Sequence, residues 1–160
     1  SNLENEMAKL RTEFGNIGNV DGTSVLNGMR LLCAEDNPLN AEILEELLHM
    51  QGATCTIYSD GKQLVEAFDH VRPSDYDVIL MDVQMPGMDG YEATRTIRSG
   101  ANPLGRTISI IAMTANAFAE GVKKSLDAGM NAHLSKPVDL NALEQTLQRF
   151  RYEPSAEQPQ

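Results

Sequence analysis

From residue 30 onward, five short apolar runs alternate with longer segments of helical period, and this alternation constrains the fold more than any other feature of the chain. Short apolar strands separated by helices build a parallel sheet with helices on both faces. The expected strands cover residues 30–34, 54–58, 77–81, 108–112 and 131–134. The sequence therefore predicts a doubly wound α/β domain with five strands and five helices, in which the third and fourth strands are central.

The segments between the strands carry helix signals of their own. Asn37 is a good capping residue, Pro38 suits the first helical position, and Gly52 can end that helix. The last helix begins at Asp139 and has one apolar stripe. Three more helices are marked by Leu64, Val65 and Phe68, by Tyr91, Thr94 and Ile97, and by Phe118, Val122 and Leu126.

The two ends of the chain do not follow this pattern. We expect a linker over residues 1–29, with a cloning scar at Ser1-Asn2, the folded domain over residues 30–150, and a disordered tail over residues 151–160. The alternative at the N-terminal end is a dimerising helix, because apolar residues recur there at heptad-like spacing. Two such repeats are fewer than a coiled coil needs.

Composition argues against several classes of protein. Thirteen basic and 23 acidic residues give a formal net charge of −10, which opposes direct binding to the phosphates of nucleic acids. Cys33 and Cys55 are too few for a disulfide framework and are expected to be reduced, as in the cytoplasm. No run reaches the roughly 18 apolar residues of a membrane span, so we expect a soluble chain whose domain makes no membrane contact.

Polar side chains follow four of the five expected strands. Glu35 and Asp36 follow the first strand, Asp82 the third, Thr114 the fourth and Lys136 the fifth. Each of these residues alone would be an ordinary cap, turn or strand residue. Ligands of open α/β sheets bind beyond the carboxyl ends of the strands, which is where all of these residues are expected to meet. The pattern therefore predicts a functional site at that edge.

The three carboxylates of Glu35, Asp36 and Asp82 need a cation among them. At about 4 Å and an effective dielectric constant near 20, each pair of like charges costs roughly 4 kcal/mol before relaxation. Oxygen ligands without Cys or His favour Mg²⁺ or Mn²⁺ over Zn²⁺. Lys136 adds a compact positive charge that can meet a carboxylate or a phosphoryl oxygen, and Thr114 adds a hydroxyl donor.

This set of residues resembles the receiver (response-regulator) domain of two-component phosphorelays over about residues 30–150. The resemblance lies in the segments LLCAEDN at 31–37, VILMDVQMPGMDG at 78–90, IAMTA at 111–115 and LSKP at 134–137. It implies a flavodoxin-like fold with strand order 2-1-3-4-5. It also implies that Asp82 takes a phosphoryl group from a phosphohistidine of a histidine kinase or histidine phosphotransfer domain, and that the domain catalyses its own phosphorylation and dephosphorylation.

The resemblance also implies roles around Asp82. Glu35, Asp36, Asp82 and the backbone carbonyl of Gln84 would ligate Mg²⁺ or Mn²⁺. Lys136 and Thr114 would contact the phosphoryl oxygens, and the Lys136–Pro137 bond would be cis. Thr114 and His133, which stands where the family commonly has Tyr or Phe, would form the conformational switch. Such an imidazole can turn inward as an aromatic ring does.

Two further expectations concern the lifetime of the phosphoryl group and the partners of the domain. Gln84 and Asn116 would flank the path of the attacking water, and neither side chain is a strong general base, so hydrolysis should be slow to intermediate. Phosphodonors should dock on the first helix near Leu39, Ile43 and Leu47. The output surface should be formed by the fourth and fifth helices with the fifth strand, and the oligomeric state stays open.

Other functions are less compatible with these residues. A dehalogenase-like phosphatase also uses an Asp nucleophile, but it needs a second carboxylate, as general acid, where Gln84 stands. A flavin or nucleotide carrier would suit the fold, yet Glu35 and Asp36 replace the glycines or hydroxyls that hold a phosphate. A degenerate receiver that serves only for docking would not need the full set of site residues.

Within the family, a receiver domain of a hybrid sensor histidine kinase is favoured over a free-standing single-domain regulator. The segments at 35–40 and 82–86 look like those of hybrid kinases, and the parent kinase could be membrane-anchored. No helix-turn-helix fits outside the domain, so any effect on transcription would be indirect.

Overall fold

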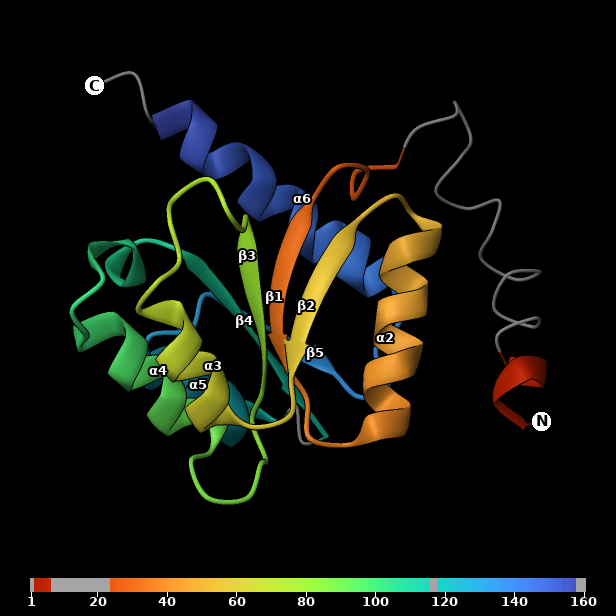
Figure 1. The fold of residues 1–160 in the computed structure, drawn as a ribbon, viewed down its shortest axis with the longest axis horizontal. Helices are drawn as coiled ribbons and strands as arrows, with labels where there is room; N and C mark the ends of the chain where they lie inside the picture. The colour runs from red at the N-terminus through yellow and green to blue at the C-terminus, as the bar shows by residue number, and fades with distance from the viewer. Residues whose placement is uncertain (1, 7–23, 116–117, 158–160) are drawn as a thin grey trace.

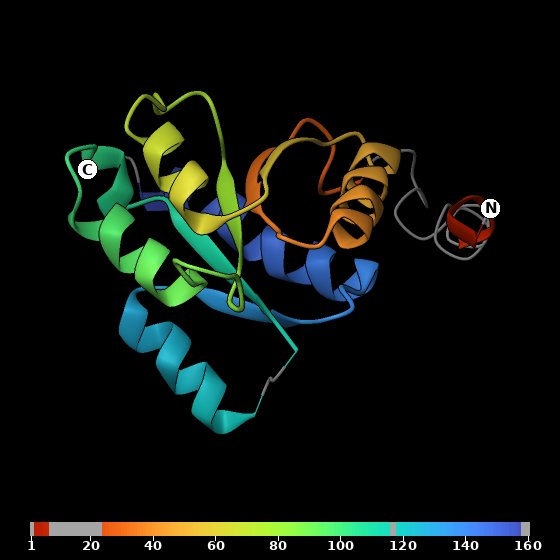
Figure 2. The same cartoon turned by 60° about the horizontal axis from the view of Figure 1, so that its bottom comes forward.

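A computed structural model of the chain describes residues 2–6, 24–115 and 118–157. Five parallel strands form one sheet with the order β2-β1-β3-β4-β5, and helices cover both faces of it (Figures 1 and 2). The predicted doubly wound α/β fold and its strand order are confirmed. The strands are Arg30–Ala34 (β1), Thr54–Tyr58 (β2), Val78–Asp82 (β3), Ser109–Thr114 (β4) and Ala132–Ser135 (β5).

Five α-helices and one short 3-10 helix connect and follow these strands. The α-helices are Pro38–Met50 (α2), Gly61–Phe68 (α3), Gly90–Ser99 (α4), Ala119–Ala128 (α5) and Leu140–Glu157 (α6), and the 3-10 helix is Pro103–Arg106 (η2). Residues 2–6 are also helical. The first predicted helix starts as its sequence indicates, because the Asn37 side chain accepts the backbone N–H groups of Leu39 and Asn40.

The core consists of two apolar layers, one on each face of the sheet. Alternate residues of a strand point to opposite faces. One set of strand residues packs with α2 and α6, and the other set packs with α3 and α4. Every residue of β3 and β4 is buried, as expected for the two strands with the most apolar sequences. This rigid centre fixes the position of whatever follows the carboxyl ends of β3 and β4.

Both ends of the domain differ from the sequence-based boundaries. Residues 24–29 lie in the expected linker, but Leu26 and Met29 are buried in the layer of α2 and α6. At the other end, α6 continues to Glu157, so residues 151–157 of the expected disordered tail are helical. The extension includes Pro154, which has no backbone N–H to donate to the helix, so local helix propensity does not account for it. Residues 7–23, which include most of the heptad-like segment, lie outside the described residues.

Helix α5 exists where it was predicted, but its apolar stripe does not face the sheet. Phe118 and Leu126 are 77% and 56% exposed, and Val122 is only partly buried. The buried side chains of α5 that the structure describes are the small residues Ser125 and Ala128. The helix can lie close to its neighbours because these side chains are small, and this packing turns the larger apolar residues outward.

None of the helices in the described part of the chain is both long enough and apolar enough to cross a membrane.

Arg98 joins the elements that surround α4 at the end far from the predicted site. Its guanidinium donates hydrogen bonds to the carbonyl oxygens of Gly129, Gly105 and Ile108 and to Oδ1 of Asn131, at 2.7–2.9 Å. These acceptors belong to η2 and to the residues that border β4, α5 and β5. One side chain therefore connects four segments that are distant in the sequence.

We expect Arg98→Met to lower the free energy of unfolding by about 2–4 kcal/mol, because several carbonyl groups would lose a charged donor that no neighbour replaces. Urea unfolding followed by circular dichroism measures this change. Arg95→Met, an exposed position on the same helix, is the matched control and should change stability by less than about 0.5 kcal/mol. Equal effects of the two substitutions would contradict the role assigned to Arg98.

Candidate functional site

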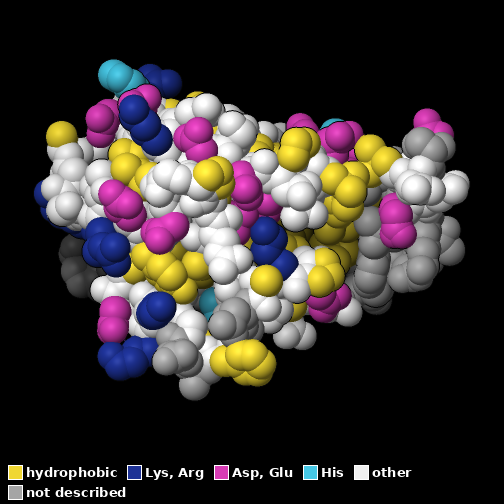
Figure 3. All heavy atoms as spheres, turned by 90° about the horizontal axis from the view of Figure 1, so that it is seen from below, with side chains coloured by type: hydrophobic (Ala, Val, Ile, Leu, Met, Phe, Trp, Pro, Cys, Tyr) yellow, Lys and Arg dark blue, Asp and Glu magenta, His cyan; other side chains and the backbone are white. Residues whose placement is uncertain are grey.

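The predicted site residues meet at the carboxyl edge of the sheet. Asp82 is the last residue of β3 and is 1% exposed, and Glu35, directly after β1, is 3% exposed. Asp36 is partly exposed at the rim. Seen from this edge, acidic side chains gather near the middle of the surface with a basic side chain beside them (Figure 3). The sheet topology thus brings together residues that are far apart in the sequence.

Glu35, Asp36 and Asp82 form a compact group of carboxylates. One oxygen of each residue lies within 4.8 Å of one oxygen of each of the others. Glu35 is held in place at both ends, since its backbone N–H donates to the carbonyl oxygen of Tyr58 and its Oε2 accepts the backbone N–H of Asn37. Three carboxylate oxygens at this spacing are suited to a hard divalent cation such as Mg²⁺.

Lys136 brings a positive charge to the buried carboxylates. Its Nζ lies 3.1 Å from Oδ2 of Asp82 and 3.2 Å from Oε1 of Glu35, and its side chain is 20% exposed. The backbone N–H of Lys136 donates to the carbonyl oxygen of Thr114, which joins the loop after β5 to the end of β4. The Lys136–Pro137 bond is cis, as the resemblance implied.

The ionisation of the site reflects its burial. The pKa of the Asp82 carboxyl is raised to about 7. Burial is the largest cause, the hydrogen bond from Lys136 acts to lower the pKa, and the nearby charge of Glu35 acts to raise it. For Lys136, burial acts to lower the pKa, but the contacts with Asp82 and Glu35 outweigh burial and raise it. Without a bound cation the site therefore holds a proton on Asp82 at pH values below about 7, together with a protonated lysine.

The loop from β3 to α4 places backbone groups directly over Asp82. The backbone N–H of Gln84 donates to Oδ1 of Asp82 at 3.2 Å, and the N–H of Gly90 donates to the carbonyl oxygen of Val83. A Cβ atom at Gly90 would lie 2.3 Å from the carbonyl oxygen of Asp82, so only glycine lets α4 begin this close to β3. The carbonyl of Gln84 as a metal ligand stays a prediction.

The two proposed switch residues lie on one face of the sheet. Thr114 ends β4 and is buried, and His133 on β5 is partly buried. In the register of β4 and β5, His133 pairs with Ala112, and Thr114 pairs with Ser135. Paired residues and those two positions apart along a strand share a face, so His133 and Thr114 are diagonal neighbours on that face. Asn116 lies outside the described residues.

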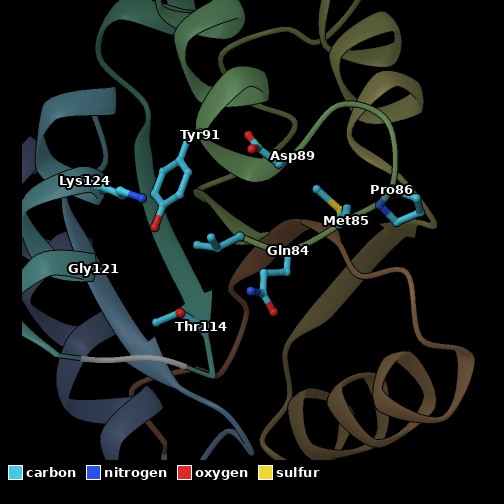
Figure 4. A pocket seen from close by; sticks show the side chains of 9 residues that line it. Gln84, Met85, Pro86, Asp89, Tyr91, Thr114, Gly121 and Lys124 are labelled. Atoms are coloured by element: carbon cyan, nitrogen blue, oxygen red, sulfur yellow. The ribbon is translucent and has the colours of Figure 1, made fainter.

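A pocket of about 600 Å³ opens next to the residues that follow Asp82, between the loop after β3, α4 and α5 (Figure 4). Its lining includes Gln84 and Thr114, which the sequence singled out, and Tyr91 and Lys124, which it did not. The sequence pattern places Tyr91 only in the stripe of a predicted helix. Because neither residue follows a strand, inspection of the strand ends gave no signal for them.

The predicted docking residues of α2 are not equally accessible. Leu39 is 51% exposed and Ile43 is partly buried, but Leu47 is 3% exposed. Leu47 packs inward because it lies beside Leu44 and Leu48 on the buried side of α2. It therefore offers very little surface to a partner, and Leu39 and Ile43 are the accessible members of the predicted docking residues.

Comparisons with known proteins agree with this architecture. The family model of the response regulator receiver domain matches residues 31–148. The sensor histidine kinase RcsC of Salmonella typhi is 41% identical over 119 residues, which cover 74% of this chain and 12% of that kinase. This chain thus spans only a small part of the length of such relatives.

Solved structures show the same relationship. One similar structure is the receiver domain of the sensor histidine kinase PA1611 from Pseudomonas aeruginosa PAO1, which has a magnesium ion coordinated in its active-site cleft. Its sequence is 43% identical to this chain, and the match has a TM-score of 0.68 and covers 77% of this chain and 97% of that one. A second similar structure is the co-crystal structure of Ypd1 and the receiver domain of Ssk1 from Saccharomyces cerevisiae. That match has a TM-score of 0.69 and 27% sequence identity, and it covers 78% of this chain and 89% of that one. The chain belongs to the response regulator receiver domain family.

Because the pKa of Asp82 is raised, the effect of Asp82→Asn on the stability of the protein should depend on pH. In the metal-free protein the folded state keeps the Asp82 proton up to about pH 7, whereas the unfolded state releases it near pH 4. The wild-type protein should therefore lose stability from Asp82 as the pH rises through this window. Asp82→Asn does not titrate, so its melting temperature relative to wild type should be higher at pH 8.5 than at pH 5.5.

Thermal melts in a chelating buffer measure this difference. Added Mg²⁺ should then stabilise the wild-type protein, by about 1.4 kcal/mol at ten times the dissociation constant, and should stabilise Asp82→Asn less. The same relative melting temperature at both pH values would contradict a raised pKa at Asp82.

Proposed function

We propose that Asp82 accepts a phosphoryl group from a phosphohistidine, in a Mg²⁺-dependent reaction, and that this domain is part of a hybrid sensor histidine kinase. The observation that carries the proposal is the position of Asp82. Its carboxylate lies buried at the end of β3, 3.1 Å from the ammonium of Lys136, within a group of three carboxylates and beside an open pocket.

The chemistry follows from the charges of these groups. An Asp82 oxygen attacks phosphorus, the bond from phosphorus to the imidazole nitrogen of the donor breaks, and the imidazole leaves with the electron pair. Lys136 then moves from ion pairing with Asp82 to pairing with a phosphoryl oxygen, and the Thr114 hydroxyl donates to another oxygen. A Mg²⁺ ion held by Glu35, Asp36, Asp82 and the carbonyl of Gln84 would neutralise the remaining negative charge.

The kinds of relative support a larger parent protein. The curated relatives include sensor histidine kinases of which this chain spans 12% of the length, and a solved relative is the receiver domain of such a kinase. A histidine phosphotransfer protein as partner is supported by the co-crystal structure of Ypd1 with the Ssk1 receiver domain. Residues near the site must then form a surface that such a donor can contact.

We expect one phosphoryl group to add to the protein when it is incubated with Mg²⁺ and a phosphorylated histidine phosphotransfer protein. Intact-mass spectrometry should show the added mass, and Asp82→Asn or an excess of chelator should abolish it. The control is Asp89→Asn, which alters the N-cap residue of α4 in the loop that follows Asp82. This variant should keep the phosphoryl uptake. Uptake by Asp82→Asn at the wild-type rate would rule out Asp82 as the acceptor.

Docking of the donor on α2 can be tested at Leu39, which is exposed in the first turn of α2. Leu39 lies close to the site in the sequence, because the backbone N–H of Asn37, two residues earlier, donates to Glu35. A charge there would oppose burial in an apolar contact, so Leu39→Asp should slow transfer from the phosphotransfer protein roughly ten-fold. Leu126→Asp, an equally exposed leucine on α5, should leave transfer unchanged. Rapid-quench measurements of both variants compare the two surfaces, and equal slowing would refute docking on α2.

A further inference from the structure

The pocket beside Asp82 contains a lysine that the reaction proposed above does not use. Lys124 extends from α5 toward Tyr91 of α4, and the hydroxyl of Tyr91 points toward the end of the pocket at which Thr114 lies (Figure 4). Met85 and Pro86 form an apolar part of the lining. Asp89 also lines the pocket, but its Oδ1 already accepts the backbone N–H of Glu92 at the start of α4.

The pocket begins at Val83 and Gln84, the two residues that follow Asp82. Gln84 lines it, and the backbone N–H of Gln84 donates to Oδ1 of Asp82 at 3.2 Å. Thr114 lines it too, at the end of the strand that neighbours β3. Lys136 contacts both Asp82 and Glu35, and Lys136 and Glu35 line a smaller cavity that α2 borders. The large open space beside Asp82 therefore lies toward α4 and α5.

The leaving group of a small phosphodonor would enter this open space. In phosphoryl transfer the attacking oxygen and the leaving group lie on opposite sides of phosphorus. When Asp82 attacks a small phosphodonor, its leaving group must project away from Asp82, past Gln84 and Thr114. A pocket of about 600 Å³ has room for a small acyl group there, with an ammonium and a phenol hydroxyl on its wall.

We propose that this pocket binds the acyl group of small acyl phosphates, with Lys124 and the Tyr91 hydroxyl stabilising the carboxylate that leaves. The proposal rests on Asp82 being the phosphoacceptor. The bond from an Asp82 oxygen to phosphorus forms while the bond from phosphorus to the acyl oxygen breaks. The carboxylate departs with the electron pair and needs no proton, because it is a stable anion at neutral pH.

The charge of Lys124 makes the pocket selective among donors. A positive charge favours a leaving group that gains negative charge, as the acyl oxygen does. Phosphoramidate instead loses ammonia, which is neutral when it departs, and so gains nothing from Lys124. The two donors thus share the attack by Asp82 and differ in the group that enters the pocket.

The test compares acetyl phosphate with phosphoramidate, each with Mg²⁺, by intact-mass measurement of phosphoryl uptake over time. Lys124→Gln should lower the second-order rate constant for acetyl phosphate about two- to five-fold, the size expected of one exposed ion pair. Lys124→Glu should lower it further, and Tyr91→Phe should lower it about two-fold. None of these substitutions should lower the rate with phosphoramidate.

Lys123→Gln is the matched control. Its exposed side chain pairs with Asp127 at 3.0 Å and is not among the residues of the pocket, so the rates with both donors should match wild type. Equal loss with both donors, or no loss with acetyl phosphate in either Lys124 variant, would overturn the proposal while leaving Asp82 as the acceptor. Failure of the wild-type protein to take up phosphate from either donor would overturn the proposed function as well.

Discussion

The site depends on one unfavourable arrangement, which is the burial of carboxylates at the end of a central strand. Asp82 and Glu35 are almost fully shielded from water, and each lies about 3 Å from the same ammonium group. Lys136 carries one positive charge against the two buried carboxylates and the rim carboxylate of Asp36. Burial is the main reason why the pKa of Asp82 is raised, and the nearby charge of Glu35 raises it further, so a cation or a proton must complete the site.

The scaffold keeps this arrangement from relaxing. Asp82 cannot move outward, because β3 is paired on both sides by β1 and β4 and every one of its residues is buried. Gly90 allows α4 to close over the strand end, and the backbone of Lys136 is tied to β4 through Thr114. The charges are therefore held at fixed positions, which is the condition under which electrostatic stabilisation of a transferring phosphoryl group costs no reorganisation.

The sequence predicted the fold and the members of the carboxylate group because both follow from local rules. Apolar runs determine the strands, and residues directly after parallel strands must meet at one edge. It did not predict the outward stripe of α5, because periodicity defines an apolar face but not the direction in which that face points. It also missed Leu26 and Met29, which belong to no repeating unit, and Tyr91 and Lys124, whose importance depends on how α4 and α5 pack. The pattern likewise does not show that Leu47 faces the core, because that depends on how α2 packs against the sheet.

The outward stripe of α5 has an energetic consequence for any partner of the domain. Burying a side chain such as Phe118 or Leu126 contributes roughly 1.5–3 kcal/mol, and in the isolated domain most of that gain is still available. The inner face of the helix bears small side chains, and the helix borders the pocket near Asp82 through Gly121 and Lys124. If a partner binds α5 more tightly in the phosphorylated state, linkage requires that the bound partner favour phosphorylation by the same factor. Binding on this helix would then act as an input to the site as well as a response to it.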